Sequence, residues 1–328
     1  PKVSIAFRPI DSLLLRGSYG TGFKAPDLEQ VYQPPSAAPG WFVDSWQCSQ
    51  TDADTDGDGR PNVDPDSLPD THPCRYQSFH PMTFSGNRDL EPEESDNWTA
   101  GLVWSPSPNF SIIVDYYKIK MDEQIWNEED QALLDEELRR RQVGEAGQRV
   151  GDVVRTSSGQ IVTVFSTYEN VDRLETDGID TEASFQFSIG QLGDVSTTLR
   201  WTHVLNYDKD YNDGRGSIDW VGKVGHPQDR AQLSVSWSLG NLSAAVFGNH
   251  VSDQDNPSWE DGWDDEHLAS FTTWDVQASY VTPWDGVFTV GARNVLDRKP
   301  PRYNNGFYDY WQHEIYGRVP YLRLEQSF

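Results

Sequence analysis

Apolar and polar residues alternate with a period of two through most of this sequence, which predicts a chain built mainly from β-strands. The alternation is clearest in residues 231–239, where every odd-numbered position is apolar and every even-numbered position is serine or glutamine. The same pattern recurs along the chain, and about eleven segments fit it. The expected strands span residues 2–8, 12–22, 95–105, 109–121, 173–189, 195–208, 229–239, 241–252, 269–282, 286–296 and 318–328.

The connections between these strands alternate in length. Short turns, such as residues 9–11 and 240–241, are followed by long loops, and the longest loop spans residues 23–94. A soluble sandwich has no reason to keep every second connection short, whereas a membrane barrel has tight periplasmic turns and long external loops. We therefore expect an all-β fold: a transmembrane antiparallel β-barrel with short periplasmic turns and long extracellular loops.

Two further elements are expected inside the loop that follows residue 121. Residues 128–142 read as a short helix, with leucines on one face and arginines near its C-terminal end. Apolar pairs at 153–154 and 161–164 flank Ser158 and Gly159, which predicts an extra β-hairpin.

The composition agrees with strands that expose one face to water. Hydrophobic residues make up 36% of the chain, yet it holds 13 Trp, 14 Tyr and 14 Phe, and its mean hydropathy is −0.68. No run of about 18 apolar residues occurs, so no transmembrane helix is expected. Barrel strands need only about 10 alternating residues, so this composition is compatible with a membrane barrel.

The charge and the residue patterns exclude several function classes. The formal net charge is −26, which excludes nucleic acid as a partner because phosphate binding needs a basic surface. The histidines are scattered without metal-ligand spacing, and no Gly-rich phosphate loop or nucleophile elbow occurs. We therefore do not expect this chain to be an enzyme.

An acidic run in the longest loop is the sharpest chemical motif. Alternate aspartates around glycines can bring several hard oxygens onto one calcium ion. It is not a standard EF-hand, because Pro65 or Val63 stands where that loop needs glutamate. It more closely resembles the calcium-binding repeats of thrombospondin type 3. The candidate metal ligands are Asp52, Asp54, Asp56, Asp58, Asn62, Asp64 and Asp66.

We expect this calcium to be structural, while a calcium linked to the substrate and a solvated loop without any ion stay open as alternatives. Cys48 and Cys74 are the two cysteines of the chain, and they bracket the acidic run. A disulfide between them would fit an extracytoplasmic compartment, and two free thiols are the alternative.

Several segments, taken together and in order, resemble the C-terminal half of TonB-dependent outer-membrane receptors. Singly each match is weak, but they span nearly the whole chain. The matching segments are residues 15–28, 87–93, 168–170 with 176–180, 294–297, and the last strand with Gly317, Arg318 and Phe328.

This resemblance implies a location in the bacterial outer membrane, in contact with its lipid. The family's barrel has about 22 strands and is filled by a plug domain, so residues 1–328 are expected to form its C-terminal part, without the plug and the segment that contacts TonB. The implied function is energised import of a small-molecule nutrient, with an iron–siderophore complex as the leading candidate. Vitamin B12 or an oligosaccharide, a passive porin, and a soluble calcium-stabilised extracellular β-domain such as an adhesin are the alternatives.

Overall fold

The structure is a computed structural model. It describes all residues except 70, 76, 128–129, 211–216, 257–265, 303–307, 309–311 and 327–328.

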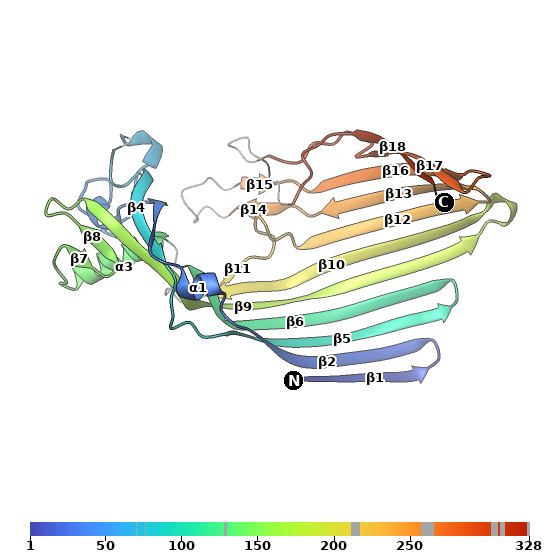
Figure 1. The fold of residues 1–328 in the computed structure, drawn as a ribbon, viewed down its shortest axis with the longest axis horizontal. Coiled ribbons are helices and arrows are strands. Elements are labelled where there is room, and N and C mark those ends of the chain that lie inside the picture. Colours follow the sequence, from blue (N-terminus) through green and yellow to red (C-terminus); the bar gives the residue numbers. More distant parts are fainter. Residues whose placement is uncertain are drawn as a thin grey trace.

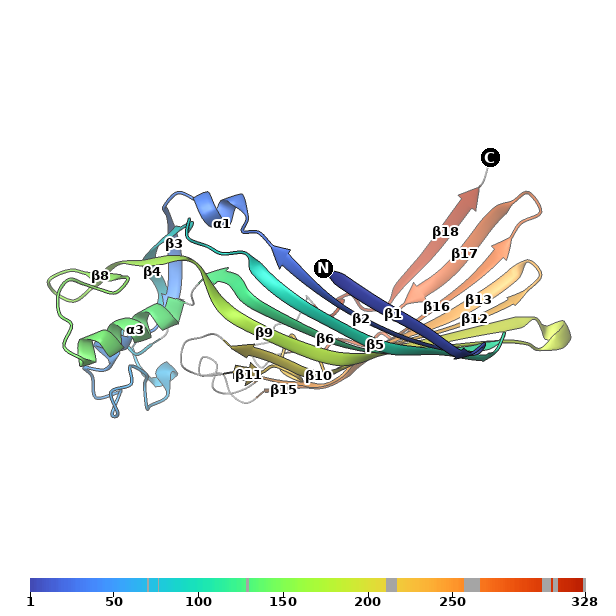
Figure 2. The same cartoon turned by 90° about the horizontal axis from the view of Figure 1, so that it is seen from below.

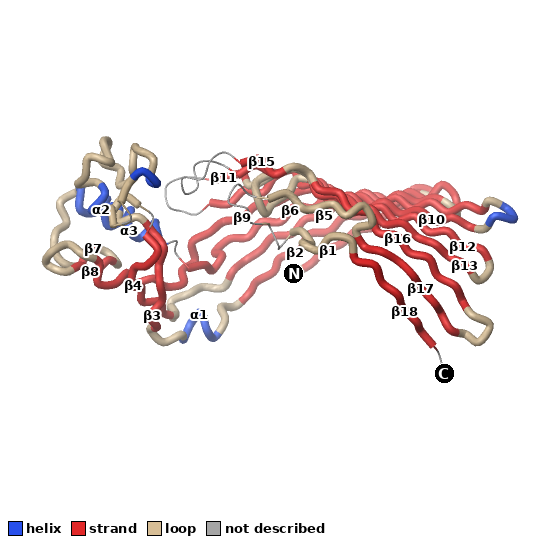
Figure 3. Tube along the Cα trace, turned by 90° about the horizontal axis from the view of Figure 1, so that it is seen from above, coloured by secondary structure: helices blue, strands red, loops and turns tan. Residues whose placement is uncertain are grey.

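Eleven strands follow one another in a single antiparallel meander, each hydrogen-bonded to the next (Figure 1). They are β1 (Lys2–Ile10), β2 (Leu13–Lys24), β5 (Glu93–Ser107), β6 (Phe110–Asn127), β9 (Ile161–Ser188), β10 (Asp194–Asp210), β12 (Asp229–Leu239), β13 (Leu242–Val251), β16 (Phe271–Val281), β17 (Gly286–Arg293) and β18 (Val319–Gln326). Every one of the eleven expected strands is confirmed. Figures 2 and 3 show that the sheet is curved, with β1 and β18 as its two end strands.

One face of this sheet carries a continuous apolar belt. The pairing register places Val235 opposite Val246, and Val246 opposite Val276. The belt is formed by Ile5, Phe7, Leu15, Leu102, Ile112, Val114, Phe185, Leu199, Leu233, Val235, Val246, Val276, Val290, Leu322 and Leu324. Leu199 and Val246, on the two strands beside β12, are 40% and 38% exposed, so no second layer of the described chain covers the belt there. An apolar surface of this extent needs an apolar partner outside the chain.

The opposite face is polar. Arg16 and Asp115 lie on either side of Gly101 in neighbouring strands, and the Arg16 guanidinium donates a hydrogen bond of 2.9 Å to the Asp115 carboxylate. Gly101 makes this bridge possible, because a Cβ at that position would collide with the Asp115 carboxylate. A second cross-strand pair joins Arg200 to Glu182 at 2.9 Å. Two faces of opposite polarity are what a membrane barrel wall requires.

Among the described residues, no helix is both long and apolar enough to cross a membrane.

Two of the long loops fold together into a small domain beyond one end of the sheet (Figure 1). We call residues 36–85 and 130–167 the loop domain. It contains β3 (Ser36–Phe42), α2 (Ser45–Cys48), the 3₁₀ helix η1 (Pro65–Ser67), β4 (Gln77–Ser85), α3 (Asp130–Gln142), β7 (Arg149–Val150), β8 (Val153–Arg155) and the first residues of β9. The remaining short elements are α1 (Leu28–Tyr32), η2 (Gly190–Leu192), β11 (Ser217–Asp219), β14 (Gln254–Asn256) and β15 (Glu266–Leu268).

The loop domain has its own hydrophobic core. Phe42, Met82, Leu134, Val153 and Val164 are buried together, and they come from β3, β4, α3, β8 and β9. The expected helix is confirmed over its described residues, and the expected hairpin is confirmed as the pairing of β8 with the start of β9. The strands β3 and β4 were not expected, since the sequence predicts an irregular loop from 23 to 94.

Candidate functional site: the acidic turn, the loop domain and the strand junctions

Three of the predicted calcium ligands lie together in a tight turn. One carboxylate oxygen from each of Asp54, Asp56 and Asp58 lies within 4.8 Å of the others. Gly57 and Gly59 have φ angles of 78° and 87°, and these left-handed conformations fold the turn so that alternate aspartates face the same point.

Asp54 is the fixed member of this group. Its carboxylate accepts hydrogen bonds of 2.7 Å from the backbone N–H groups of Gly57 and Gly59, and its side chain is almost fully buried. Burial raises the pKa of Asp54, but the N–H donors of Gly59 and Gly57 outweigh it, so the pKa of this carboxyl lies below its ordinary value. Asp54 is therefore ionised at neutral pH, as a calcium ligand must be.

The other predicted ligands lie around this group in different ways. Asn62 donates a 3.3 Å hydrogen bond from its amide to Asp56, and its carbonyl oxygen accepts hydrogen bonds from the N–H and hydroxyl of Thr55. Asp52 is exposed, and the backbone carbonyl of Asp64, directly before η1, accepts a hydrogen bond from the hydroxyl of Ser67. The side chain of Asp66 lies outside the described part of the structure.

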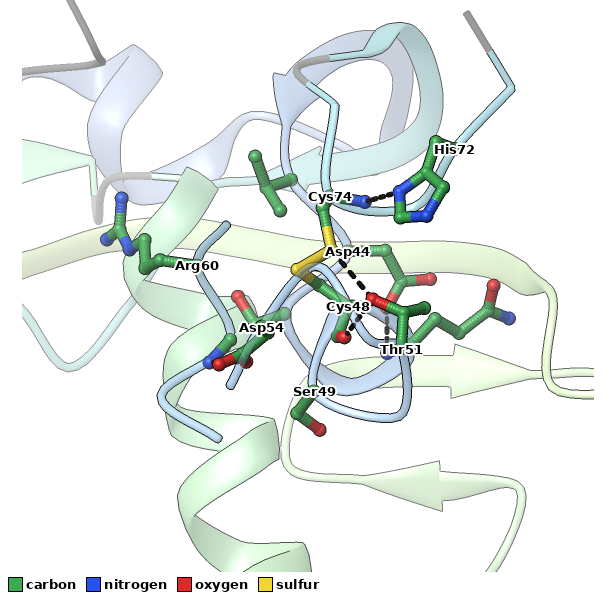
Figure 4. Close-up of a disulfide and its surroundings, with 12 residues drawn as sticks. Asp44, Cys48, Ser49, Thr51, Asp54, Arg60, His72 and Cys74 are labelled. Carbon is green, nitrogen blue, oxygen red and sulfur yellow. Dashed lines mark hydrogen bonds between the residues drawn. A yellow bond between two sulfur atoms is a disulfide. The ribbon is translucent and has the colours of Figure 1, made fainter. Parts of the chain in front are cut away.

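A disulfide between Cys48 and Cys74 holds the base of the acidic run (Figure 4). Both cysteines are fully buried, and they pack with Val43 and Ala53, the residue directly before Asp54. The disulfide confirms the pairing expected from the sequence, and free thiols are excluded. The acidic turn is thus attached to a rigid base.

A buried ion-pair centre joins three segments of the loop domain. The Arg155 guanidinium donates two hydrogen bonds of 2.7 Å to the Asp44 carboxylate and two, of 2.7 and 2.6 Å, to the Glu137 carboxylate. The ring of Trp46 lies under both Arg155 and Arg141. Burial lowers the pKa of Arg155, but the two carboxylates outweigh it, and the pKa is raised above its ordinary value. Sequence reasoning missed this centre, because its members are far apart in the chain.

The first three family-like motifs meet where strands leave the sheet for the loop domain. The Asn170 side chain accepts a hydrogen bond from the Glu91 N–H at 2.8 Å and donates to the carbonyls of Glu91 and Glu123 at 2.9 and 2.8 Å. Asn87 donates from its side chain to the Tyr168 carbonyl, and its backbone N–H donates to the carbonyl of Gln30, two residues after the first motif. Lys24 of the first motif forms an ion pair of 3.3 Å with Glu93 of the second. These motifs therefore form one junction, and their polar side chains satisfy backbone groups that no longer pair in the sheet.

The last two motifs form a second junction. The Asp297 carboxylate accepts a hydrogen bond of 2.8 Å from the N–H of Arg318. A Cβ at Gly317 would collide with an oxygen of the same carboxylate, so a larger residue there would displace the Asp297 side chain. Asn294 closes the turn by bonding both backbone groups of Arg298. Phe328 is outside the described residues, so its expected role stays a prediction.

The family model described as "TonB dependent receptor-like, beta-barrel" matches residues 1–295. The chain belongs to this family. No curated relative matches it. The apolar belt is therefore the lipid-facing surface of an outer-membrane barrel wall, the polar face lines the lumen, and the loop domain lies on the extracellular side. The chain is not an enzyme, and the alternative of a soluble extracellular β-domain is wrong.

Solved structures with the same fold are distant in sequence. The siderophore receptor PirA from Acinetobacter baumannii is 15% identical with a TM-score of 0.64, and the match covers 100% of this chain and 41% of PirA. A variant of the ferric enterobactin receptor PfeA from Pseudomonas aeruginosa, solved with enterobactin, is 13% identical with a TM-score of 0.64, covering 99% and 40%. The copper transporter OprC is 13% identical with a TM-score of 0.55, covering 100% and 39%. The chain thus spans about two fifths of the length of these proteins, and the likeness shows the fold alone.

Proposed function

We propose that this chain forms the C-terminal part of the wall of a TonB-dependent receptor that imports a scarce nutrient, and that the nutrient is an iron–siderophore complex. The observation that carries the proposal is the continuous apolar belt across eleven strands, backed by a polar face. A wall of this kind can surround a plug-filled lumen wide enough for a metal chelate.

The loop domain and the junctions support a receptor rather than a passive porin. A porin needs an open mouth, whereas here two long loops fold into a domain with its own core, disulfide and buried ion pairs. Two of the matched structures are named as siderophore receptors, which makes the iron complex the leading candidate. In this proposal TonB acts through the plug and a segment outside this chain.

The test is uptake of radioactive iron by cells that produce the full-length protein, grown under iron starvation and compared with a deletion strain. We expect uptake to depend on the protein and to stop when TonB is absent. Equal uptake in both strains would refute the iron proposal. The same two strains, supplied with vitamin B12, oligosaccharides or copper as the limiting nutrient, separate the iron complex from these rivals.

We also propose that the acidic turn binds one calcium ion with a structural role. Its support is the convergence of the Asp54, Asp56 and Asp58 carboxylates and the low pKa of Asp54. Hard oxygen ligands of this kind suit calcium, whose charge would offset the repulsion among the aspartates.

Isothermal titration of the full-length protein with calcium tests this second proposal. We expect binding heat that the double variant Asp54→Asn/Asp56→Asn abolishes and that the control Glu145→Gln, at an exposed position of the same domain, leaves unchanged. Absence of heat in the unmodified protein would end the calcium proposal and leave the transport proposal standing.

A further inference from the structure

A polar depression lies at the extracellular end of the wall, on the face that lines the lumen. Its volume is about 450 Å³, and side chains of β13, β16 and β17 form it together with residues 312–316. Its wall includes Asn249, Thr273 and Asp275, which alternate along their strands with residues of the lipid-facing side. The depression therefore opens toward the lumen and not toward the membrane.

The segment that closes the depression is held in place by contacts with the neighbouring loops. His313 is buried, and its ring stacks edge-on against Phe271 with centroids 5.1 Å apart. Gln312 accepts a hydrogen bond from Arg230 and donates one of 3.0 Å to Gln254 of β14. These contacts hold the described lining residues in fixed positions.

The charged groups of this lining are mainly acidic. Asp275 and Glu314 are carboxylates, and Arg293 is the single arginine or lysine among the described residues of the lining. The Arg293 guanidinium lies 3.9 Å from Glu314, so these two charges partly offset each other, and Asp275 gives the described lining a net negative charge. The Asp275 carboxylate is oriented by a 2.7 Å hydrogen bond from the N–H of Asn294. The remaining polar lining combines the amides of Asn249, Asn294 and Gln312 with Thr273, His313 and Tyr316, and such uncharged groups bind neutral ligand groups.

The field of the whole chain has the same sign, because its net charge is −26. A mouth of one charge sign attracts ligands of the opposite sign and repels ligands of the same sign. Ferric tris-catecholate chelates carry three negative charges, whereas ferric trihydroxamate chelates are neutral or carry one positive charge. In the part of the lining that the structure describes, one arginine faces two carboxylates, so no excess of cations offsets a trianion there.

On this geometry, and resting on the proposed iron transport, we propose that the depression is a substrate-binding site that takes a neutral or cationic ferric chelate of the trihydroxamate type. It discriminates against ferric tris-catecholates by charge. The amide of Asn249 binds a carbonyl or N–H group of the chelate, and the carboxylates of Asp275 and Glu314 bind a protonated amine where the chelate carries one.

The test is binding of two probes to the purified full-length receptor, measured by quenching of tryptophan fluorescence. The probes are ferrioxamine B, a cationic ferric trihydroxamate, and ferric enterobactin, a trianionic catecholate. We expect the first to bind at least roughly tenfold more tightly at low salt, and we expect the preference to shrink as salt screens the charges. The double variant Asp275→Asn/Glu314→Gln keeps the side-chain shapes and should remove most of the preference. The control Glu145→Gln removes one charge in the loop domain and should leave the preference intact.

The outcomes separate this inference from the proposed function. If ferric enterobactin binds as tightly as ferrioxamine B or more tightly, iron transport stands and the charge selection is wrong. If the double variant behaves like the control, the depression is not the site. If neither chelate binds while iron uptake still depends on the protein, the inference is wrong and the transport proposal stands.

Discussion

Replacing Arg155 with methionine should destabilise the loop domain more than any other single change in its polar residues. Arg155 is 2% exposed, and the carboxylates that it binds, Asp44 and Glu137, belong to residues that are 5% and 0% exposed. Removing the guanidinium leaves two buried carboxylates without their main counter-charge, which typically costs about 3–5 kcal/mol. A typical domain is stable by about 5–15 kcal/mol, so the loss is a large part of the total.

Hydrogen exchange followed by mass spectrometry, on the full-length protein in detergent, can measure this loss locally. We expect peptides from α2, α3 and β8 to lose protection, while peptides from the barrel strands keep theirs. The control is Arg139→Met on the exposed side of α3, where the Arg139–Glu136 pair is largely in solvent and an ion pair contributes little to stability. If Arg155→Met loses no more protection than this control, the buried centre does not hold the domain together.

Three further outcomes are expected. Replacing both Cys48 and Cys74 with serine should destabilise the loop domain by about 3.5 kcal/mol, the loop-closure value for this spacing, visible as faster proteolysis within it. Burial lowers the pKa of His80 in the folded protein. The neutral ring therefore contributes its full share of stability above the pKa of the unfolded chain, and this share is lost as the pH falls below that value. Hydrogen exchange of the loop domain at pH 7.5 and 5.5 should show the loss of protection, and His80→Gln should make the protection less dependent on pH. Leu233→Arg on the belt should cost about 2–4 kcal/mol in unfolding from lipid vesicles, whereas Ser234→Arg on the lumen face should cost little; equal costs would contradict the assigned faces.

The eleven barrel strands could be predicted because their pattern is local. Each strand is apolar on the lipid side and polar on the lumen side, so alternation within about ten residues is sufficient. The boundary of β9 was predicted less well: the expected strand begins at residue 173, but β9 begins at Ile161. Residues 161–164 of this extension were expected as one strand of a separate hairpin with β8, whereas residues 164–167 pair with β4, which lies far away in the chain. Such pairing leaves no periodic pattern within the segment itself.

The strands β3 and β4 were missed for a chemical reason. Each contains a proline, and a proline inside a run argues against a strand. In the structure Pro39 and Pro81 lie directly opposite each other, and β4 begins its pairing with β9 only at Met82. The prolines therefore occupy positions at which their missing N–H groups do not interrupt the sheet.

The acidic turn could be predicted in part for a similar reason. Asp54, Asp56 and Asp58 converge because the two glycines between and after them fold a short stretch of backbone. The buried centre around Arg155 could not be predicted, since Asp44 is 111 residues away and Glu137 is 18 residues away. Neither residue differs in its local sequence from the many exposed carboxylates of this chain.

The family-like motifs identify the fold but not the nutrient, because their side chains bond to the backbone and not to a ligand. Asn170 and Asp297 bond to backbone groups at the points where strands leave the barrel, and those groups need partners in a barrel wall whatever it transports. Asp275 and Glu314, by contrast, face the lumen depression, and Glu314 lies outside the motifs. A change at a junction should therefore weaken folding for every substrate alike. A change in the depression should alter the order in which substrates are preferred, and this difference separates architectural residues from those that determine specificity.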